Sequence, residues 1–144
     1  MGQLSASREI AATPSEVWAV IANPSSYEQW LSMHQKWKGD LPAELTAGAK
    51  VTEVISMMGM PNTIAWNVDK CDAPTALVFS GEGMAGVKVE LGFNVSAAGS
   101  GTLLEMSCSF EGQMIVGALG KAVEKQGAIE VDSSLTKLTE LLGS

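Results

Sequence analysis

The sequence predicts an α+β fold: a curved antiparallel sheet of about six to seven strands wrapped around a long C-terminal helix, with two short helices after the first strand. Three patterns predict it. They are an apolar stripe at helical period near the C-terminus, one-sided alternation of apolar and polar residues from 49 to 111, and a helix-capping sequence beginning at Thr13. Without repeats, linkers or low-complexity tracts, we expect one domain over residues 1–144.

The C-terminal stripe runs through a helix expected from 117 to 142. Charged residues lie mostly off the stripe, which consists of Val116, Gly120, Val123, Gly127, Val131, Leu135, Leu138 and Leu142. Glycine in a helix face lets another backbone come close or leaves space open. We therefore expect a cavity between the sheet and the glycine-containing half of this helix.

The first strand and the two short helices come before residue 31. Residues 3–10 alternate apolar and polar side chains, and Arg8 is the one charged residue on the inward side. Thr13 and Glu16, with Pro14 between them, form a capping box that begins a helix. The dipeptide Asn23-Pro24 ends it and can cap a second short helix.

The sheet is expected mainly from strands with one apolar and one polar face. After a short strand near Trp37, alternation predicts strands over 51–57, 63–69, 77–79, 87–96 and 104–111, separated by turns rich in glycine and proline. One-sided alternation is typical of an antiparallel sheet with one buried face. A single helix can cover so broad an apolar face only if the sheet curls around it. Such curling would leave an interior space between the sheet and the helix.

This order of elements resembles the helix-grip fold of the START-related superfamily, which includes lipid-transfer domains, plant pollen-allergen proteins and polyketide cyclases. The residues look most like a branch of small stand-alone actinobacterial members, some of them named as the toxin of a toxin–antitoxin pair. The similar motifs are Tyr27-x-x-Trp30-Leu31-x-x-His34-x-x-Trp37, Leu41-Pro42, Gly59-Met60-Pro61-Asn62-x-Ile64-x-Trp66 and Gly81-x-Gly83-x-x-Gly86-Val87-Lys88-Val89. The resemblance implies the fold but no particular activity, because function depends on the site.

The composition argues against nucleic acid, an anionic membrane, a metal ion and a cofactor as partners of this chain. The formal net charge of −7 and the scattering of nine Lys and Arg residues argue against nucleic acid and against docking on an anionic membrane. Cys71 and Cys108 lack a CxxC spacing, and His34 is the single histidine, so we expect no metal and no cofactor. Two reduced cysteines fit the cytoplasm. We expect no stable membrane insertion, and a monomer or weak dimer with a possible protein partner.

Glu53 is the most informative single residue. By strand parity it shares the apolar face with Val51 and Ile55, and a buried carboxylate must be paired, protonated or open to a cavity. Our hypothesis is that Arg8 and Glu53 meet in the cavity, as a pair or across a polar ligand group. The alternative is that a β-bulge shifts the register, so that both face water.

His34 lies between Trp30 and Trp37 and has no acid–base partner adjacent in sequence. It can be a packed residue that orders its segment, a ligand contact or a general base. No nucleophile–base–acid set appears elsewhere, so we assign no catalytic residue. The glycines at 81, 83 and 86 match a dinucleotide fingerprint only superficially, since no helix follows them.

Aromatic residues and eight methionines suit an adaptable apolar lining, although the same residues would also make an ordinary core. The methionine-rich turns at 57–60 and 83–86 are expected to rim the cavity mouth. The predicted ligand-lining residues are Arg8, Trp30, His34, Glu53, Ile55, Met57, Trp66, Phe79, Leu91, Phe93, Met106, Phe110, Gly120, Val123 and Gly127.

Three functions follow from these expectations. The first is non-enzymatic binding of a small hydrophobic molecule, such as a lipid, polyketide or aromatic metabolite, between the sheet and the C-terminal helix. The second, which the resemblance to polyketide cyclases implies, is a cyclase or aromatase-like enzyme in which Glu53, His34 or Arg8 moves protons. The third, implied by the resemblance alone, is a toxin or regulator that acts through a protein partner.

Overall fold

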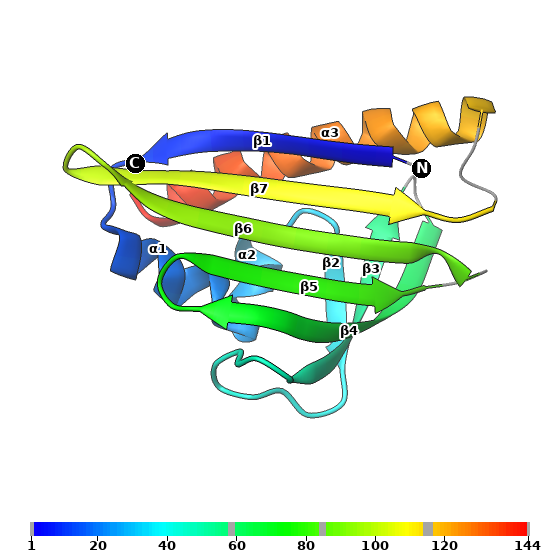
Figure 1. The fold of residues 1–144 in the computed structure, drawn as a ribbon, viewed down its shortest axis with the longest axis horizontal. Helices are drawn as coiled ribbons and strands as arrows, with labels where there is room; N and C mark the ends of the chain where they lie inside the picture. Colours follow the sequence, from blue (N-terminus) through cyan, green and yellow to red (C-terminus); the bar gives the residue numbers. More distant parts are fainter. Residues whose placement is uncertain (1, 58–59, 84–85, 114–116, 144) are drawn as a thin grey trace.

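The computed structural model describes residues 2–57, 60–83, 86–113 and 117–143 (Figure 1). In chain order the elements are β1 (Gly2–Ile10), α1 (Pro14–Ile21), the 3-10 turn η1 (Pro24–Ser26), α2 (Tyr27–Trp30), β2 (His34–Lys38), β3 (Lys50–Met57), β4 (Met60–Asp72), β5 (Ala76–Glu82), β6 (Lys88–Ala98), β7 (Gly101–Glu111) and α3 (Gly117–Leu141).

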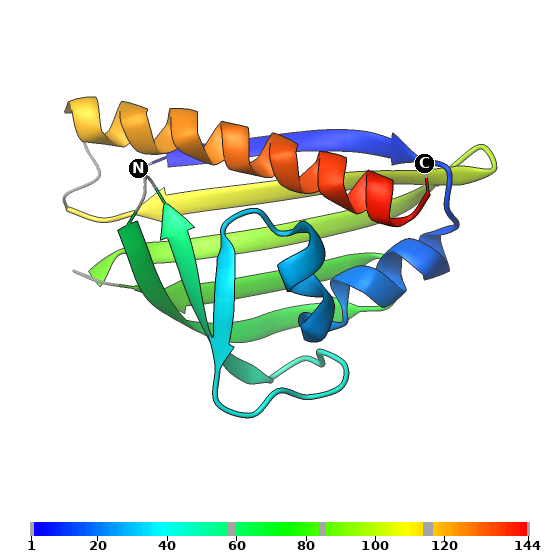
Figure 2. The same cartoon turned by 180° about the vertical axis from the view of Figure 1, so that it is seen from behind.

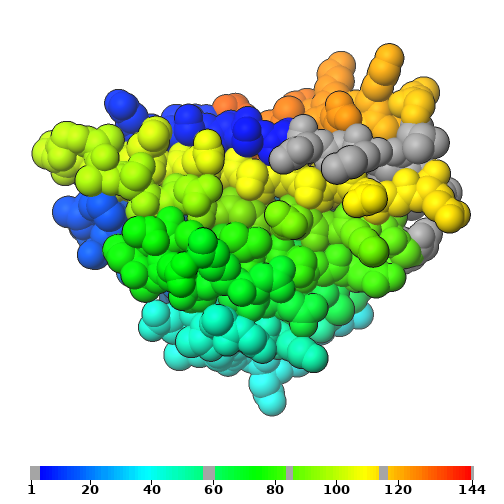
Figure 3. Space-filling view, in the orientation of Figure 1, coloured from blue at the N-terminus to red at the C-terminus, as the bar shows by residue number. Residues whose placement is uncertain are grey.

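The strands form one antiparallel sheet in the order β1-β7-β6-β5-β4-β3-β2. Strands β2 to β7 follow one another as a meander, and β1 joins the far side beside β7. The sheet curls so that β2 and β3 turn across the open side, and all helices lie on that side (Figure 2). The predicted fold, with its long terminal helix and two short helices, is confirmed. Figure 3 shows the opposite, outward face of the sheet.

The start of α1 follows the predicted capping box. The Glu16 amide N–H donates to Thr13 Oγ1 at 3.2 Å, and the Thr13 N–H donates to Glu16 Oε1 at 3.0 Å. The backbone hydrogen bond from Thr13, with its side-chain bond, lowers the pKa of the Glu16 carboxyl, because both favour the ionised form. Asn23 Oδ1 accepts from the Ser25 N–H at 3.1 Å and so begins η1.

Helix α3 packs against β1, β7 and α2 with the predicted stripe turned inward. Its buried residues are Gly120, Val123, Gly127, Val131, Ser134, Leu135 and Leu138. Val116, which the stripe also included, lies outside the described residues. The expected space is absent at Gly127, where a Cβ atom would lie 2.6 Å from Leu4 Cδ2 and 3.5 Å from Phe110 Cε2. This glycine therefore lets α3 approach β1 and β7 closely.

Gly81 on β5 has a different packing role. It pairs with Trp66 on β4, and a Cβ atom would lie 2.7 Å from Ile64 Cγ2, 2.8 Å from the Ala65 carbonyl oxygen and 2.9 Å from Trp66 Cε3. Two of these neighbours are fixed, because one is backbone and the other is a packed indole ring. The missing side chain at Gly81 thus makes room for Trp66 inside the sheet.

We expect Gly81→Ala to lower the free energy of unfolding by about 2 kcal/mol, because the new methyl group overpacks against backbone and indole. Gly127→Ala is the matched control. There only the end of the Leu4 side chain must move, and alanine gains about 1 kcal/mol of helix propensity, so the net change should stay below about 1 kcal/mol. Urea unfolding followed by tryptophan fluorescence measures both, and an equal loss in the two variants would contradict this account.

Candidate functional site: a buried carboxylate beside an apolar cavity

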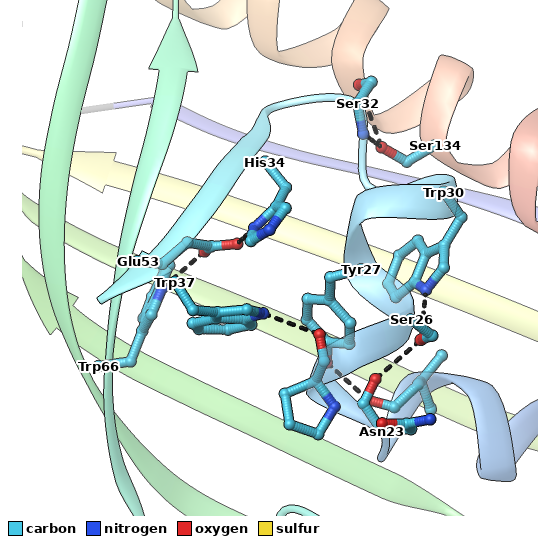
Figure 4. Close-up of polar contacts among 12 residues, drawn as sticks. Asn23, Ser26, Tyr27, Trp30, Ser32, His34, Trp37, Glu53, Trp66 and Ser134 are labelled. Atoms are coloured by element: carbon cyan, nitrogen blue, oxygen red, sulfur yellow. Dashed lines mark hydrogen bonds and ion pairs between the residues drawn. The ribbon is translucent and has the colours of Figure 1, made fainter. Parts of the chain in front are cut away.

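Glu53 on β3 is 1% exposed and points to the inner side of the sheet (Figure 4). Its Oε2 atom lies 2.5 Å from His34 Nδ1, and its Oε1 accepts from the Trp66 indole N–H at 2.9 Å. Burying a carboxylate without partners costs several kcal/mol, and these two contacts from β2 and β4 offset that cost. A carboxylate has about four lone-pair sites, so Glu53 retains capacity to accept further bonds.

A β-bulge brings His34 to this carboxylate. In the β2–β3 pairing His34 lies opposite Ile55, and the register then shifts before Lys36 lies opposite Val54 and Trp37 opposite Glu53. An uninterrupted strand would point residues 34 and 37 to opposite faces, whereas the extra residue puts both on the face of Glu53. The two rings accordingly lie 5.2 Å apart between centroids.

Trp66 reaches Glu53 through ordinary strand parity. Glu53 pairs with Ile64 on β4, and Trp66 lies two residues further on, opposite Val51. Side chains two residues apart on a strand share a face, so Trp66 is a diagonal neighbour of Glu53. The inward position predicted for Glu53 is confirmed.

An apolar cavity adjoins the carboxylate. Its described lining consists of Leu31, Met33, Glu53, Ile55, Trp66, Val89, Leu91, Cys108 and Phe110. The volume is about 10 Å³, which is room for about one water molecule. The cavity expected between the sheet and the helices is thus small where the described residues line it, because buried side chains occupy much of the neighbouring space.

Aromatic rings around Tyr27 occupy much of that space. The Tyr27 ring lies 4.7 Å from Trp30 and 5.5 Å from Trp37 between centroids, and its hydroxyl donates to the Ile21 carbonyl oxygen at 2.6 Å (Figure 4). Burial, together with the negative charge of Glu53, raises the pKa of Tyr27 well above its usual value. The phenol therefore stays a neutral hydrogen-bond donor that holds α2 against α1.

One wall of the cavity is fastened to α3 by Ser32, which lies between Leu31 and Met33. The Ser32 N–H donates to Ser134 Oγ at 3.0 Å, and the Ser32 hydroxyl lies 2.6 Å from Glu130 Oε2. Ser134 is fully buried, so its hydroxyl needs such partners. We call these contacts between Ser32 and α3 the Ser32 clip.

Arg8 lies elsewhere, and the expected meeting with Glu53 is wrong. Its guanidinium forms an ion pair with Asp132 Oδ1 at 2.6 Å and donates to Thr136 Oγ1 at 2.9 Å, both on α3. The Arg8 side chain is 31% exposed and that of Asp132 is 71% exposed. Strand β1 is an edge strand covered by α3, so its inward arginine reaches past the helix to solvent instead of into the interior.

The other predicted lining residues divide into three groups. Ile55, Trp66, Leu91 and Phe110 line the cavity with Glu53, and His34 lies behind that carboxylate. Buried residues outside the described lining are Trp30, Phe79, Phe93, Met106, Gly120, Val123 and Gly127. The side chain of Met57 lies outside the described residues, as do Met58, Gly59, Met84 and Ala85 of the two turns expected at the cavity mouth. Ligand contact stays a prediction for all of them.

Leu31, Val89 and Cys108 line the cavity although they were not among the predicted lining residues, and Met33 was expected there only as one of the eight methionines. Val89 and Cys108 lie opposite Phe110 and Leu91 in the β6–β7 pairing, so parity alone would have found them. Leu31 and Met33 lie in an irregular segment and gave no periodic signal. Over the described ranges, no group of three or more His, Cys, Asp or Glu residues could hold a metal ion, and no helix could cross a membrane.

A family model described as polyketide cyclase/dehydrase and lipid transport matches residues 1–143. The chain belongs to this family. Among its relatives, the uncharacterized protein Rv1546 of Mycobacterium tuberculosis is 29% identical over 143 residues, which are 99% of this chain and 100% of the relative. Toxin Rv0910 of the same organism is 29% identical over 135 residues, or 94% of each chain.

Solved structures agree with the fold of the polyketide cyclase/dehydrase and lipid transport family. A START superfamily protein from Mycobacterium smegmatis has a TM-score of 0.81 at 16% identity and is matched over 99% of this chain and 97% of its own. TTHA0849 from Thermus thermophilus also reaches 0.81, at 22% identity, over 97% and 96% of the two chains. The family model confirms the predicted polyketide cyclase-like family, and these structures confirm the predicted fold.

We expect Glu53→Gln to lower the free energy of unfolding by about 3 kcal/mol. A glutamine amide has only one oxygen, so its nitrogen would face either His34 Nδ1 or the Trp66 N–H, each of which now contacts a carboxylate oxygen. Asp132→Asn removes the same charge from the exposed ion pair with Arg8 and should cost less than about 1 kcal/mol. Chemical denaturation at pH 7 compares the two. Equal losses would show that the buried contacts of Glu53 contribute no more than a surface pair.

Proposed function

We propose that this protein binds a small hydrophobic molecule on the inner side of the sheet, beneath the connection between α2 and β2 and in contact with Glu53. The observation that carries the proposal is the cavity wall, where Glu53 is the one charged group among the described lining residues and keeps lone-pair sites beyond its contacts with His34 and Trp66. A purely structural core gains little from such a group, because hydrophobic residues of similar volume are often as stable. Membership of a family that includes lipid transport supports the same function.

Binding requires the cavity to widen, since its present volume accommodates about one water molecule. Most of the described lining comes from paired strands of the sheet, whereas Leu31 and Met33 lie in the short connection between α2 and β2. That connection is held by the Ser32 clip and by the bond from the Ser56 N–H to the Met33 carbonyl oxygen at 2.7 Å. We propose that it moves away from α3 to admit the ligand.

An enzymatic function of the cyclase or aromatase type is the second candidate, favoured by the His34–Glu53 contact beside the cavity. Such an enzyme should have several polar groups positioned around its substrate. The described wall, apart from Glu53, is apolar or weakly polar, so binding accounts for it better.

A role through a protein partner is the third candidate, and it rests on the relative named Toxin Rv0910. That name describes the relative.

We also propose a cytoplasmic location. Cys71 and Cys108 are both free thiols, and a reducing compartment would keep them so.

The proposal can be tested through Cys108, which lines the cavity. Burial raises the pKa of this thiol to about 12, so at pH 8 it is almost wholly protonated and reacts only when the cavity opens. We expect saturating 2-naphthol to slow modification of Cys108 by a disulfide reagent at least tenfold, as followed by peptide mass spectrometry. Half-buried Cys71 lies outside the described cavity lining, so its unchanged rate is the internal control. Equal rates at Cys108 with and without ligand would contradict binding.

The Ser32 clip makes a separate prediction about opening. Ser32→Ala removes the hydroxyl bonds to Glu130, and the loss of about 1 kcal/mol should accelerate modification of Cys108 about fivefold while leaving Cys71 unchanged. Ser7→Ala, an exposed change on β1, should alter neither rate. If Ser32→Ala accelerates both cysteines equally, the change has lowered global stability and the clip does not control the cavity.

A further inference from the structure

We propose that the cavity selects hydrophobic molecules that carry one neutral hydrogen-bond donor, such as a hydroxyl or an N–H group, and that it rejects carboxylates. The inference rests on the proposed function, because it specifies the chemistry of the ligand that Glu53 would meet. It follows from which polar groups belong to the described lining residues and from the contacts that the nearby charged groups already make.

Among the described lining residues, Glu53 is the strong hydrogen-bond acceptor, and none has a strong donor that lacks a partner. Each Glu53 oxygen keeps a lone-pair site beyond its present contact, which a ligand could reach once the cavity widens. The Trp66 N–H, the strong donor among these residues, already points at Glu53 Oε1. The Cys108 thiol is a weak donor, and the other six described lining residues are Leu31, Met33, Ile55, Val89, Leu91 and Phe110.

These lining groups favour a ligand that itself carries a hydrogen-bond donor. A hydroxyl inside the cavity can donate to Glu53, and hydrogen bonds to charged groups are stronger than bonds between neutral groups. A ligand with acceptors alone would lose its bonds to water and meet no replacement at the described wall. Among equally hydrophobic molecules of one shape, the donor should therefore decide affinity.

Charge works against anionic ligands at the same place. The side chains of His34 and Glu53 are only 3% and 1% exposed, so water screens this pair little. The imidazole Nδ1 already faces Glu53, and Arg8 is engaged by Asp132 and Thr136 on α3. A ligand carboxylate would thus lie near Glu53 in a poorly screened apolar space, and the described lining residues include no Lys or Arg to neutralise it.

The experiment compares three ligands that share one ring system: 2-naphthol carries a hydroxyl donor, 2-methylnaphthalene carries no polar group, and 2-naphthoate is an anion. Titration calorimetry at pH 7 should give 2-naphthol about 10- to 100-fold tighter binding than 2-methylnaphthalene, the range expected for one bond to a charged acceptor. The binding of 2-naphthoate should be the weakest of the three.

The outcomes separate this inference from the proposed function. If 2-methylnaphthalene binds as tightly as 2-naphthol, or 2-naphthoate binds more tightly, the protein is a hydrophobic-ligand binder but the selectivity is wrong. If none of the three slows modification of Cys108 or shows heat of binding, both the function and the inference are overturned.

Variants of Glu53 and Asp132 test whether the ligand selectivity comes from Glu53. Glu53→Gln should bring the affinities of 2-naphthol and 2-naphthoate within about threefold of each other, since the amide can donate as well as accept. Asp132→Asn, the same charge change at the exposed ion pair, should leave the order of the three ligands unchanged. A full preference retained in Glu53→Gln would overturn the role of Glu53. If that variant does not fold, the order in the unmodified chain decides.

Discussion

Glu53 on β3 contacts His34 on β2 and Trp66 on β4, and these two contacts connect three neighbouring strands on the inner side of the sheet. Glu53 could not remain buried on β3 without partners from β2 and β4, and β2 supplies its partner only because a bulge turns His34 inward. The described cavity lies beside this carboxylate, so its chemistry is set by the same contacts. The stability of this part of the sheet and the ligand preference proposed above therefore depend on one group of three side chains.

The fold could be predicted because its determinants are periodic and local. Strand alternation placed Glu53 on the inner face, the capping box began α1 where it was expected, and the stripe from Gly120 to Leu138 faces the sheet. Each of these signals needs only residues close together in the chain. The order of the elements then limits the topology to few arrangements, and the meander with β1 beside β7 is the one observed.

The site could be predicted only in part, because its partners depend on irregular features. The partner of Glu53 is His34, whose orientation comes from a bulge that no period reveals. Arg8 shares the inward parity of its strand, yet it lies at the sheet edge where α3 offers Asp132 and Thr136. The space expected beneath Gly127 is taken by Leu4, since a missing side chain permits close approach as readily as a void.

The bulge in β2 also protects the sheet. A curled sheet that does not close into a barrel keeps two edges, each with unpaired backbone groups that another chain could join. Helix α3 packs against β1, while β2 has only five residues, a shifted register and exposed lysines at 36 and 38. The irregularity that turns His34 toward Glu53 thereby also makes this edge a poor template for strand addition and amyloid-like aggregation.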